Sequence, residues 1–410
     1  MFRTPHDLRV FAAWTLGMLG MTLAAAGSGV PEERFERLTQ GINVSHWFAQ
    51  TGSLTEEHFR SHMTNADFDA IREMGFRHVR LPVDPRPLFD SENPESLPED
   101  CLTHLDWAIG AFLDRDIAVI VEIHTSGEFL DRLEDDDAHV ENVATFWRAL
   151  AAYLSRYDPD RLFLELLNEP QVRSADRWNW VVRELASAVR EGAQEHTIIV
   201  CGHEWSNDLR LMELEPLDDP NLVYNFHFYT PHNFTHQAAT WGADFWPELR
   251  HMPFPSNPDN IQDALEATED SGVRDIIWDY GEQRWNEERI NQRIAEVAAW
   301  GEEHGLRLTC NEFGIYHAGV PREDGLRWLR AVREALEDHG IGWAMWDYRG
   351  GFRVVQRDNG TVYSDEGVLE ALGLINWAMW DYRGGFRPGR GDAAAVSSDE
   401  GLLETSGLGN

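Results

Sequence analysis

From residue 38 onward the chain alternates short apolar runs with amphipathic helical patterns. Such alternation implies parallel strands joined by helical crossovers, because parallel strands cannot be joined by a tight turn. Eight such units fit a closed (β/α)₈ barrel. We therefore predict an α/β fold of the TIM-barrel type. The eight runs are Leu38–Val44, Phe76–Val83, Ile117–His124, Leu162–Leu167, Thr197–Gly202, Leu222–Tyr229, Leu306–Cys310 and Ile341–Trp346.

The segments between these runs carry apolar residues at helical spacing. Asp176 is the expected N-cap of the helix over 177–194, and Thr64 or Asn65 that of the helix over 67–74. The expected helices include Asp67–Met74, Val140–Tyr157, Arg177–Gln194, Glu287–His304 and Glu323–His339.

An open, doubly wound sheet is the rival architecture. That fold usually carries a glycine-rich phosphate-binding turn after its first strand, but Asn43-Val44-Ser45-His46-Trp47 stands there instead. Polar residues also follow nearly all the runs. A barrel gathers all of these strand ends at one mouth, whereas an open sheet does not, so the pattern favours the barrel.

Two short strings end apolar runs with a carboxylate. They are Asn168-Glu169-Pro170 and Asn311-Glu312-Phe313-Gly314. Pro170 disfavours helical geometry at Glu169, which suits a rigid carboxylate at a strand end. If both strands belong to one barrel, both glutamates can face one pocket. Two facing carboxylates can cleave a glycosidic bond when one stays protonated and the other is ionised.

Residues that can shift the pKa values of the two carboxyl groups apart, so that one is protonated and the other ionised, also lie at strand ends. Arg80, His124, His227 and Tyr229 are the candidates. Sugars present flat C–H faces that pack on aromatic rings. Three tryptophans that follow or end strands are therefore expected to bind substrate, namely Trp47, Trp205 and Trp346.

Taken together, these residues resemble the pattern of glycoside hydrolase family 5, the retaining (β/α)₈ enzymes that include many cellulases. The likeness covers about residues 38–370. The departures are a long insert and a duplicated C-terminal end. The matching positions are Arg80 after the second strand's apolar run, His124 at the third strand, the Asn168–Glu169 pair, His227 and Tyr229 at the sixth, Glu312 at the seventh and Trp346 at the eighth.

The resemblance implies a role for each matching residue. Glu169 would be the general acid and then the general base, and Glu312 the nucleophile. Asn168 would hold the sugar 2-hydroxyl, and Trp346 would stack under the sugar. Arg80 would position Glu312 and keep it charged, with His227 beside Glu169 and Tyr229 beside Glu312. No cofactor is implied.

The leading functional hypothesis is a secreted retaining glycosidase that cuts β-glucan, with endo-β-1,4-glucanase activity. A mannanase or a β-1,3-glucanase with the same mechanism is the closer alternative. A carbohydrate-binding protein that has lost catalysis is the alternative from another class. The sequence leaves the exact linkage open.

The charge of the chain limits its partners. The formal net charge is −36, and all 35 cationic Lys/Arg side chains are arginine. This charge opposes nucleic-acid phosphates and anionic membranes. We expect a neutral partner, a β-linked polysaccharide or oligosaccharide, and a monomeric protein.

No residue spacing matches a strong metal or disulfide motif. Cys101, Cys201 and Cys310 are sparse and odd in number, so we expect buried small side chains. The histidines at 227, 232 and 236 do not match a metal motif, and no metal is predicted.

The ends of the chain carry two further expectations. Residues 1–26 read as a signal peptide, with an apolar run Val10–Leu23 before Ala24-Ala25-Ala26, which predicts secretion; a retained anchor is the alternative. Residues 342–353 recur as residues 376–387. We expect the first copy to form the eighth strand of the domain 27–374, because it directly follows the preceding helix, and residues 375–410 to be a duplicated segment. The alternative is that the second copy forms this strand.

Residues 230–285 form an unusually long connection after the sixth strand. A loop of this length is usually functional or disordered. Four tryptophans favour an ordered subdomain over the site, namely Trp241, Trp246, Trp278 and Trp285.

Overall fold

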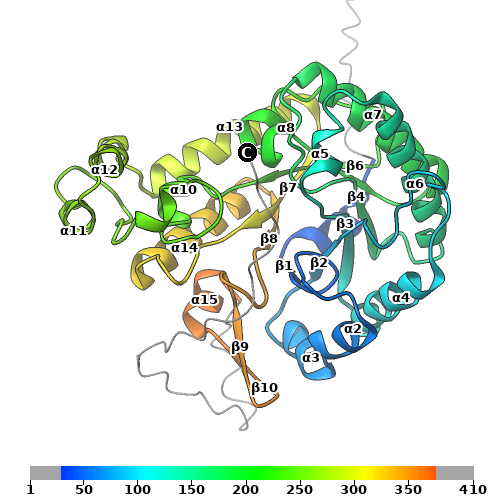
Figure 1. Cartoon of the computed structure of the whole chain (residues 1–410), viewed down its shortest axis with the longest axis horizontal. Helices are drawn as coiled ribbons and strands as arrows, with labels where there is room; N and C mark the ends of the chain where they lie inside the picture. The colour runs from blue at the N-terminus through cyan, green and yellow to red at the C-terminus, as the bar shows by residue number, and fades with distance from the viewer. Residues whose placement is uncertain (1–28, 375–410) are drawn as a thin grey trace, which may run out of the picture.

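The computed structural model describes residues 29–374 and contains a closed barrel of eight parallel strands with helices around it (Figure 1). Strand β1 pairs with β8, Gly41 opposite Ala344, which closes the barrel. The predicted fold is confirmed. The strands are β1 (Gly41–Asn43), β2 (His78–Val83), β3 (Ala118–Ile123), β4 (Leu162–Glu165), β5 (Ile198–Cys201), β6 (Leu222–His227), β7 (Arg307–Phe313) and β8 (Gly342–Met345).

The five predicted helices are present as α3, α6, α7, α13 and α14, shifted by up to three residues, and α13 has the expected bounds. Further helices join them within residues 29–374. The helices outside residues 230–285 are α1 (Glu32–Phe35), α2 (Glu56–His62), α3 (Asn65–Glu73), α4 (Glu99–Leu113), α5 (Glu128–Asp131), α6 (Asp137–Leu154), α7 (Ala175–Gly192), α8 (His203–Ser206), α9 (Asp208–Leu211), α13 (Glu287–His304), α14 (Arg322–Asp338) and α15 (Glu366–Ala371), with the 3₁₀ helix η1 (Glu36–Leu38).

One predicted cap is right and one is wrong. Thr64 is the N-cap of α3, and its backbone N–H donates to the Asp67 carboxylate at 2.7 Å. The cap of α7 is Ser174, not Asp176, because the Ser174 hydroxyl accepts from the Arg177 N–H. Asp176 lies in the first turn instead, where its negative charge favours the helix dipole.

The barrel interior changes from apolar to polar along the strands. A buried apolar layer near the N-terminal ends includes Ile120, Phe163 and Val223. Side chains two positions further along a strand point to the same face. There the same three strands carry Glu122, Glu165 and Asn225, all fully buried. Inside the barrel, a layer of polar side chains therefore lies directly on a layer of apolar side chains.

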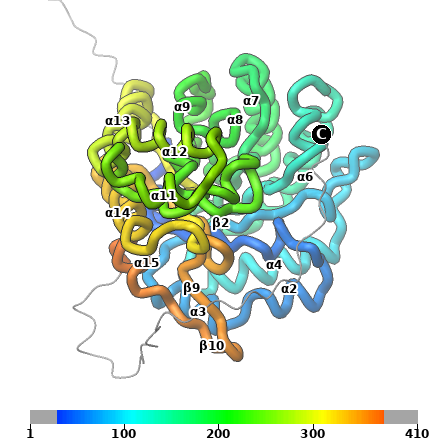
Figure 2. Tube along the Cα trace, turned by 60° about the vertical axis from the view of Figure 1, so that its left-hand side comes forward, coloured from blue at the N-terminus to red at the C-terminus, as the bar shows by residue number. Residues whose placement is uncertain are grey.

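The first copy of the C-terminal repeat forms β8, as predicted. The chain continues into a hairpin of β9 (Val355–Asp358) and β10 (Thr361–Ser364), which projects from the barrel near α3 (Figures 1 and 2). The second copy and the predicted signal peptide lie outside the described residues. Within residues 29–374, no helix is both long and apolar enough to cross a bilayer.

Residues 230–285 are ordered, as predicted. The insert contains α10 (His232–Thr235), the 3₁₀ helix η2 (Trp246–Glu248), α11 (Gln262–Glu266) and α12 (Ser271–Gln283). Its α10 lies near the barrel, whereas α11 and α12 form the outer tip (Figure 1). The insert buries its own apolar side chains, including Phe234, Leu249, Met252, Phe254, Ile261 and Tyr280.

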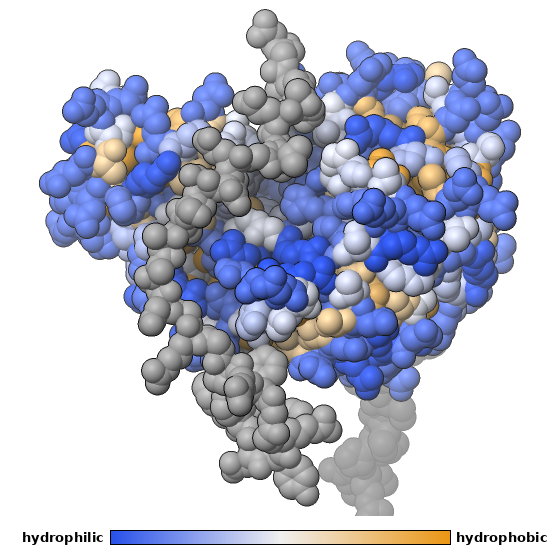
Figure 3. Space-filling model, turned by 60° about the horizontal axis from the view of Figure 1, so that its bottom comes forward, coloured by the Kyte–Doolittle hydropathy of each residue, from blue (hydrophilic) through white to orange (hydrophobic). Residues whose placement is uncertain are grey.

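We expect added salt to stabilise the protein. One face is predominantly hydrophilic (Figure 3), and the chain carries a net charge of −36. Self-repulsion of like charges opposes the compact state. Raising NaCl from about 0.01 M to about 1 M shortens the Debye length from about 30 Å to about 3 Å. The melting temperature in calorimetry should rise over this range, and a steady fall would contradict the expectation.

Candidate active site

Arg80 lies at the centre of the polar layer on β2 and is completely buried. Its guanidinium donates to Glu165 at 2.8 and 3.0 Å and to Glu312 at 2.6 Å. It also donates to the side-chain oxygens of Asn43 and Asn168, each at 3.0 Å. Burial alone would lower the pKa of Arg80, but the surrounding carboxylates raise it well above its ordinary value. Arg80 is therefore a fixed cation.

Glu312 on β7 is held by both of its oxygens. Arg80 bonds Oε1, and the Tyr229 hydroxyl donates to Oε2 at 3.0 Å. Burial and the nearby Glu312 charge raise the pKa of Tyr229 well above its ordinary value, so it donates as a neutral phenol. Glu312 is thus an oriented carboxylate.

Glu169 follows β4 and has a different environment. Its φ of 41° places it in the left-handed region before Pro170, where a helical conformation is disfavoured. Burial raises the pKa of Glu169, and the charges of His124 and Arg80 only partly oppose the shift. Burial also lowers the pKa of His227 to about 4, so at neutral pH a neutral imidazole lies 3.0 Å from Glu169 through Nδ1.

The two glutamates converge on one point. A ligand atom from each of Glu169, His227 and Glu312 lies within 4.8 Å of the other two. The Glu169 side chain remains 30% exposed, whereas that of Glu312 is 6% exposed. The carboxyl group of Glu169 is therefore pushed toward its protonated form and reachable, whereas that of Glu312 is buried and held by Arg80 and Tyr229.

Asn168 is oriented from two sides. Its Oδ1 accepts from Arg80, so its amide nitrogen faces His124 Nε2 at 3.4 Å. His124 Nδ1 in turn lies 3.2 Å from Glu122 Oε2. Burial alone would lower the pKa of His124, but the Glu122 carboxylate beside Nδ1 raises it. The Asn168 side chain is held beside Glu169 by this relay.

Two of the three predicted sugar-binding tryptophans lie near the glutamates. Trp346 follows β8, and its ring stacks at 18° on His124 with centroids 5.7 Å apart. The Trp205 side chain on α8 is exposed, and the backbone N–H of Trp205 donates to the carbonyl of Pro170, beside Glu169. Residues 204–206 all have positive φ, a costly conformation that is typical of functional sites.

The prediction for Trp47 is wrong. Its side chain is completely buried, and its Nε1 donates to the carbonyl of Phe59 at 2.9 Å. The ring packs against Trp107 in an edge-to-face arrangement, in the core between the barrel and its helices. A side chain just beyond a strand end can turn outward into this core as readily as inward to the mouth.

The polar layer contains residues that the motif search missed. Glu165 accepts from Arg80, from Asn225 and from Asn311. Glu122 lies 3.5 Å from Arg80. Both glutamates interrupt apolar runs, and a charge that is buried is almost always paired. A glutamate that interrupts an apolar run was therefore the sequence signal that could have identified both residues.

The cluster of Glu169, His227 and Glu312 is the one group in residues 29–374 with metal-ligand spacing. Glu312 already accepts from Arg80 and Tyr229, and the adjacent guanidinium would repel a cation. The chemistry of the set therefore fits a sugar site better than a metal site. The three cysteines are free. Cys201 and Cys310 are buried as predicted, but Cys101 on α4 is only partly buried, contrary to the prediction.

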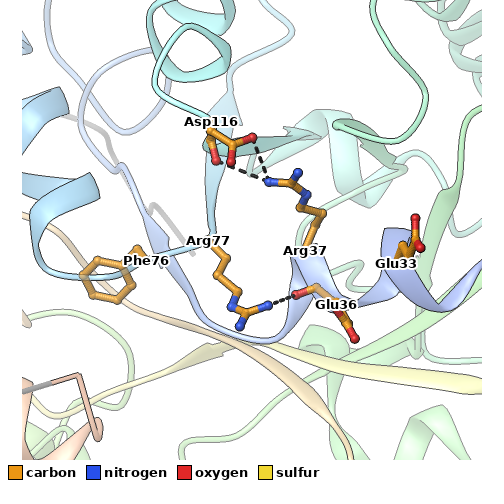
Figure 4. Close-up of a pocket in the computed structure, with 6 residues that line it drawn as sticks. All are labelled: Glu33, Glu36, Arg37, Phe76, Arg77 and Asp116. Carbon is orange, nitrogen blue, oxygen red and sulfur yellow. Dashed lines mark hydrogen bonds and ion pairs between the residues drawn. The ribbon is translucent and has the colours of Figure 1, made fainter. Parts of the chain in front are cut away.

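A hollow lies at the opposite, N-terminal end of the strands. There Arg37 pairs with Asp116, and Arg77 donates to the Glu36 carbonyl (Figure 4). Catalytic sites of these barrels lie at the C-terminal ends of the strands. We therefore interpret the Arg37–Asp116 ion pair at this hollow as stabilising the fold. It is lined by Glu33, Glu36, Arg37, Phe76, Arg77 and Asp116.

A closed parallel barrel with two converging glutamates at its C-terminal mouth defines a glycoside hydrolase of the (β/α)₈ class. The family model for cellulase, glycosyl hydrolase family 5, matches residues 38–351, and the chain belongs to this family.

Similar proteins agree with this assignment. Endoglucanase C of Acetivibrio thermocellus is 28% identical over 75% of this chain and 90% of its own length. Endoglucanase 3 of Fibrobacter succinogenes is 26% identical over 84% of this chain and 54% of its own length. The crystal structure of endoglucanase Cel5A from Thermotoga maritima superposes with a TM-score of 0.68 at 25% identity, covering 83% of this chain and 98% of that one.

The environment of Glu169 predicts a stability effect. A carboxyl group whose pKa is raised in the folded state lowers the free energy of unfolding at pH values above its unfolded pKa, near 4.5, because its ionisation costs more in the folded protein. Glu169→Gln removes that cost, so it should raise the melting temperature at pH 7, and the gain should shrink as pH falls toward 4.5. Thermal melts across this range test it. Glu303→Gln, at an exposed position, is the control, and an equal gain in both variants would contradict the prediction.

Proposed function

We propose that this protein is a secreted, retaining glycoside hydrolase that cleaves internal β-1,4 bonds of β-glucan, with Glu169 as acid/base and Glu312 as nucleophile. The observation that carries the proposal is the convergence of these two carboxyl groups within 4.8 Å in opposite electrostatic environments. Retaining enzymes use a separation of about 5–5.5 Å, whereas inverting enzymes need about 6.5–9.5 Å to admit a water.

In the first step, the Glu312 carboxylate attacks the anomeric carbon and the bond to the leaving oxygen breaks. Glu169 donates its proton to that oxygen, so the leaving sugar departs as a neutral alcohol. Arg80 and Tyr229 hold Glu312 in line for attack. The product of this step is a covalent glycosyl-enzyme intermediate.

In the second step, Glu169, now ionised, takes a proton from a water that attacks the same carbon, and Glu312 leaves. Asn168 is oriented to hold the sugar 2-hydroxyl, where hydrogen bonds strengthen in the transition state. Trp346 would stack under the sugar unit that Glu312 attacks. The exposed ring of Trp205, whose backbone N–H donates to the Pro170 carbonyl beside the acid, would contact the leaving-group sugar.

Three further observations support the substrate class and the location. The relatives from Acetivibrio thermocellus and Fibrobacter succinogenes are named endoglucanases. A neutral polysaccharide suits a chain with a net charge of −36. The apolar leader before Ala24-Ala25-Ala26 supports export. We propose a monomeric enzyme.

Product analysis on a panel of β-1,4-glucan, mixed-linkage glucan, β-1,3-glucan and β-mannan tests the proposal. We expect several oligosaccharide sizes early from β-1,4-glucan, and NMR of fresh products should show the β anomer first. Release of mannan products alone would reassign the substrate. An α anomer formed first would refute retention, and binding without turnover would point to a carbohydrate-binding protein.

The raised pKa of Glu169 predicts the alkaline limb of the rate profile. An acid with a raised pKa stays protonated to higher pH, and activity falls once it ionises. Glu169→Gln should lose this limb and lower kcat/KM on glucan by about 10²–10⁴-fold. An aryl glycoside with a leaving group that departs as a phenolate needs no proton donor. For that substrate, Glu169→Gln should lower the rate of the first step much less. An unchanged limb in the variant would assign the acid elsewhere.

A further inference from the structure

A cluster of aromatic side chains starts at the reacting carboxylate. Tyr229, Trp346 and Phe352 pack together, and Tyr316 lies against them. Tyr229 donates to Glu312, so one end of the cluster touches the catalytic pair. From there the rings step outward, with Tyr229 and Phe352 centroids 6.0 Å apart and Phe352 and Tyr316 centroids 5.8 Å apart.

Trp241 of the insert extends this cluster. Its ring centroid lies 4.8 Å from that of Tyr316, nearly perpendicular, and 6.4 Å from that of Phe352. The His236 ring lies edge-on to Trp241 and Phe352, with centroids 6.5 and 5.4 Å away, and burial lowers the pKa of His236 to about 3, so the ring is neutral. Yet Trp241 is 46% exposed. A large apolar ring is thus presented to solvent at the edge of the proposed sugar site.

The backbone around Trp241 is fixed rather than loose. Gly242 has a φ of +82°, and an added Cβ would lie 2.2 Å from the Trp246 ring. Trp246 stacks on His236 with centroids 4.7 Å apart. The insert is also tied to the loop after β7, because the Tyr316 N–H donates to the Thr235 carbonyl at 2.8 Å. The ring is therefore held in place before any substrate arrives.

We propose that Trp241, supported by Tyr316, is a stacking platform for a sugar unit of the substrate beyond the unit that is cleaved. This inference rests on the proposed function and makes the insert a determinant of chain-length preference. A sugar is the occupant that the observations favour, since the ring is continuous with the aromatic cluster that begins at Glu312.

The test is the dependence of kcat/KM on chain length, with β-1,4-glucose oligomers from the disaccharide to the hexasaccharide. For Trp241→Ala we expect no change on the shortest cleaved oligomer and a fall of about five- to tenfold on the longest, the range for losing one aromatic contact. Trp241→Phe should recover most of the loss. Trp278→Ala is the matched control, since Trp278 is also 46% exposed on the same insert but lies on α12 at its tip.

Any of three results would overturn the inference. The first is a Trp241→Ala profile equal to wild type at every length. The second is an equal loss at all lengths, and the third is an equal effect of Trp278→Ala. If wild type cleaves none of the oligomers, the proposed function fails separately. Calorimetric affinity for the hexasaccharide, compared between Glu312→Ala and Glu312→Ala/Trp241→Ala, then still decides the platform.

Discussion

Glu312→Ala is expected to lower kcat on β-glucan by about 10⁴-fold or more, the order of loss seen when a hydrolase loses its nucleophile. The methyl group cannot attack the anomeric carbon, and the other carboxylates of the polar layer, Glu122 and Glu165, are engaged with Arg80. Initial rates of reducing-sugar release measure the loss.

The same variant should stay folded. Arg80 keeps its two bonds to Glu165, so removing Glu312 leaves no cation without a partner. A melting temperature near that of wild type separates a chemical defect from unfolding. Glu303→Ala, an exposed substitution on α13, is the control for both readouts. Activity retained by a folded Glu312→Ala protein would end the assignment of the nucleophile.

Arg80→Met is expected to destabilise the protein by about 3–5 kcal/mol, the cost of leaving buried charges without their partner. Glu122 and Glu165 are both fully buried and would face each other with no guanidinium between them. Urea denaturation at pH 7 measures the free energy of unfolding. Activity should fall as well, because Glu312 would lose the donor at Oε1.

A double variant separates these two effects. Arg80→Met/Glu165→Gln removes one of the unpaired charges, so it should recover part of the lost stability while activity stays low. Arg80→Lys should not restore the wild type, because an ammonium group cannot reproduce the forked contact to Glu165. Equal instability of the single and double variants would show that charge burial is not the cause of the loss.

Much of the site could be predicted because strand ends meet at one mouth in a barrel. Arg80, Asn168, His227 and Tyr229 were identified from the chain and lie around the glutamates. Trp47 shows where this reasoning stops. It follows a strand end as Trp346 does, but the direction of a side chain there depends on the loop that follows, which turns Trp47 into the core.

The sequence by itself determined the alternation of strands and helices, and with it the closed barrel and the two glutamates at its mouth, because periodicity and strand order are local properties of a chain. Only the tertiary structure decided which charges Arg80 neutralises, which carboxyl pKa rises and how Trp241 joins the aromatic cluster. Those properties arise from burial and from contacts between residues distant in the chain, which no local pattern specifies.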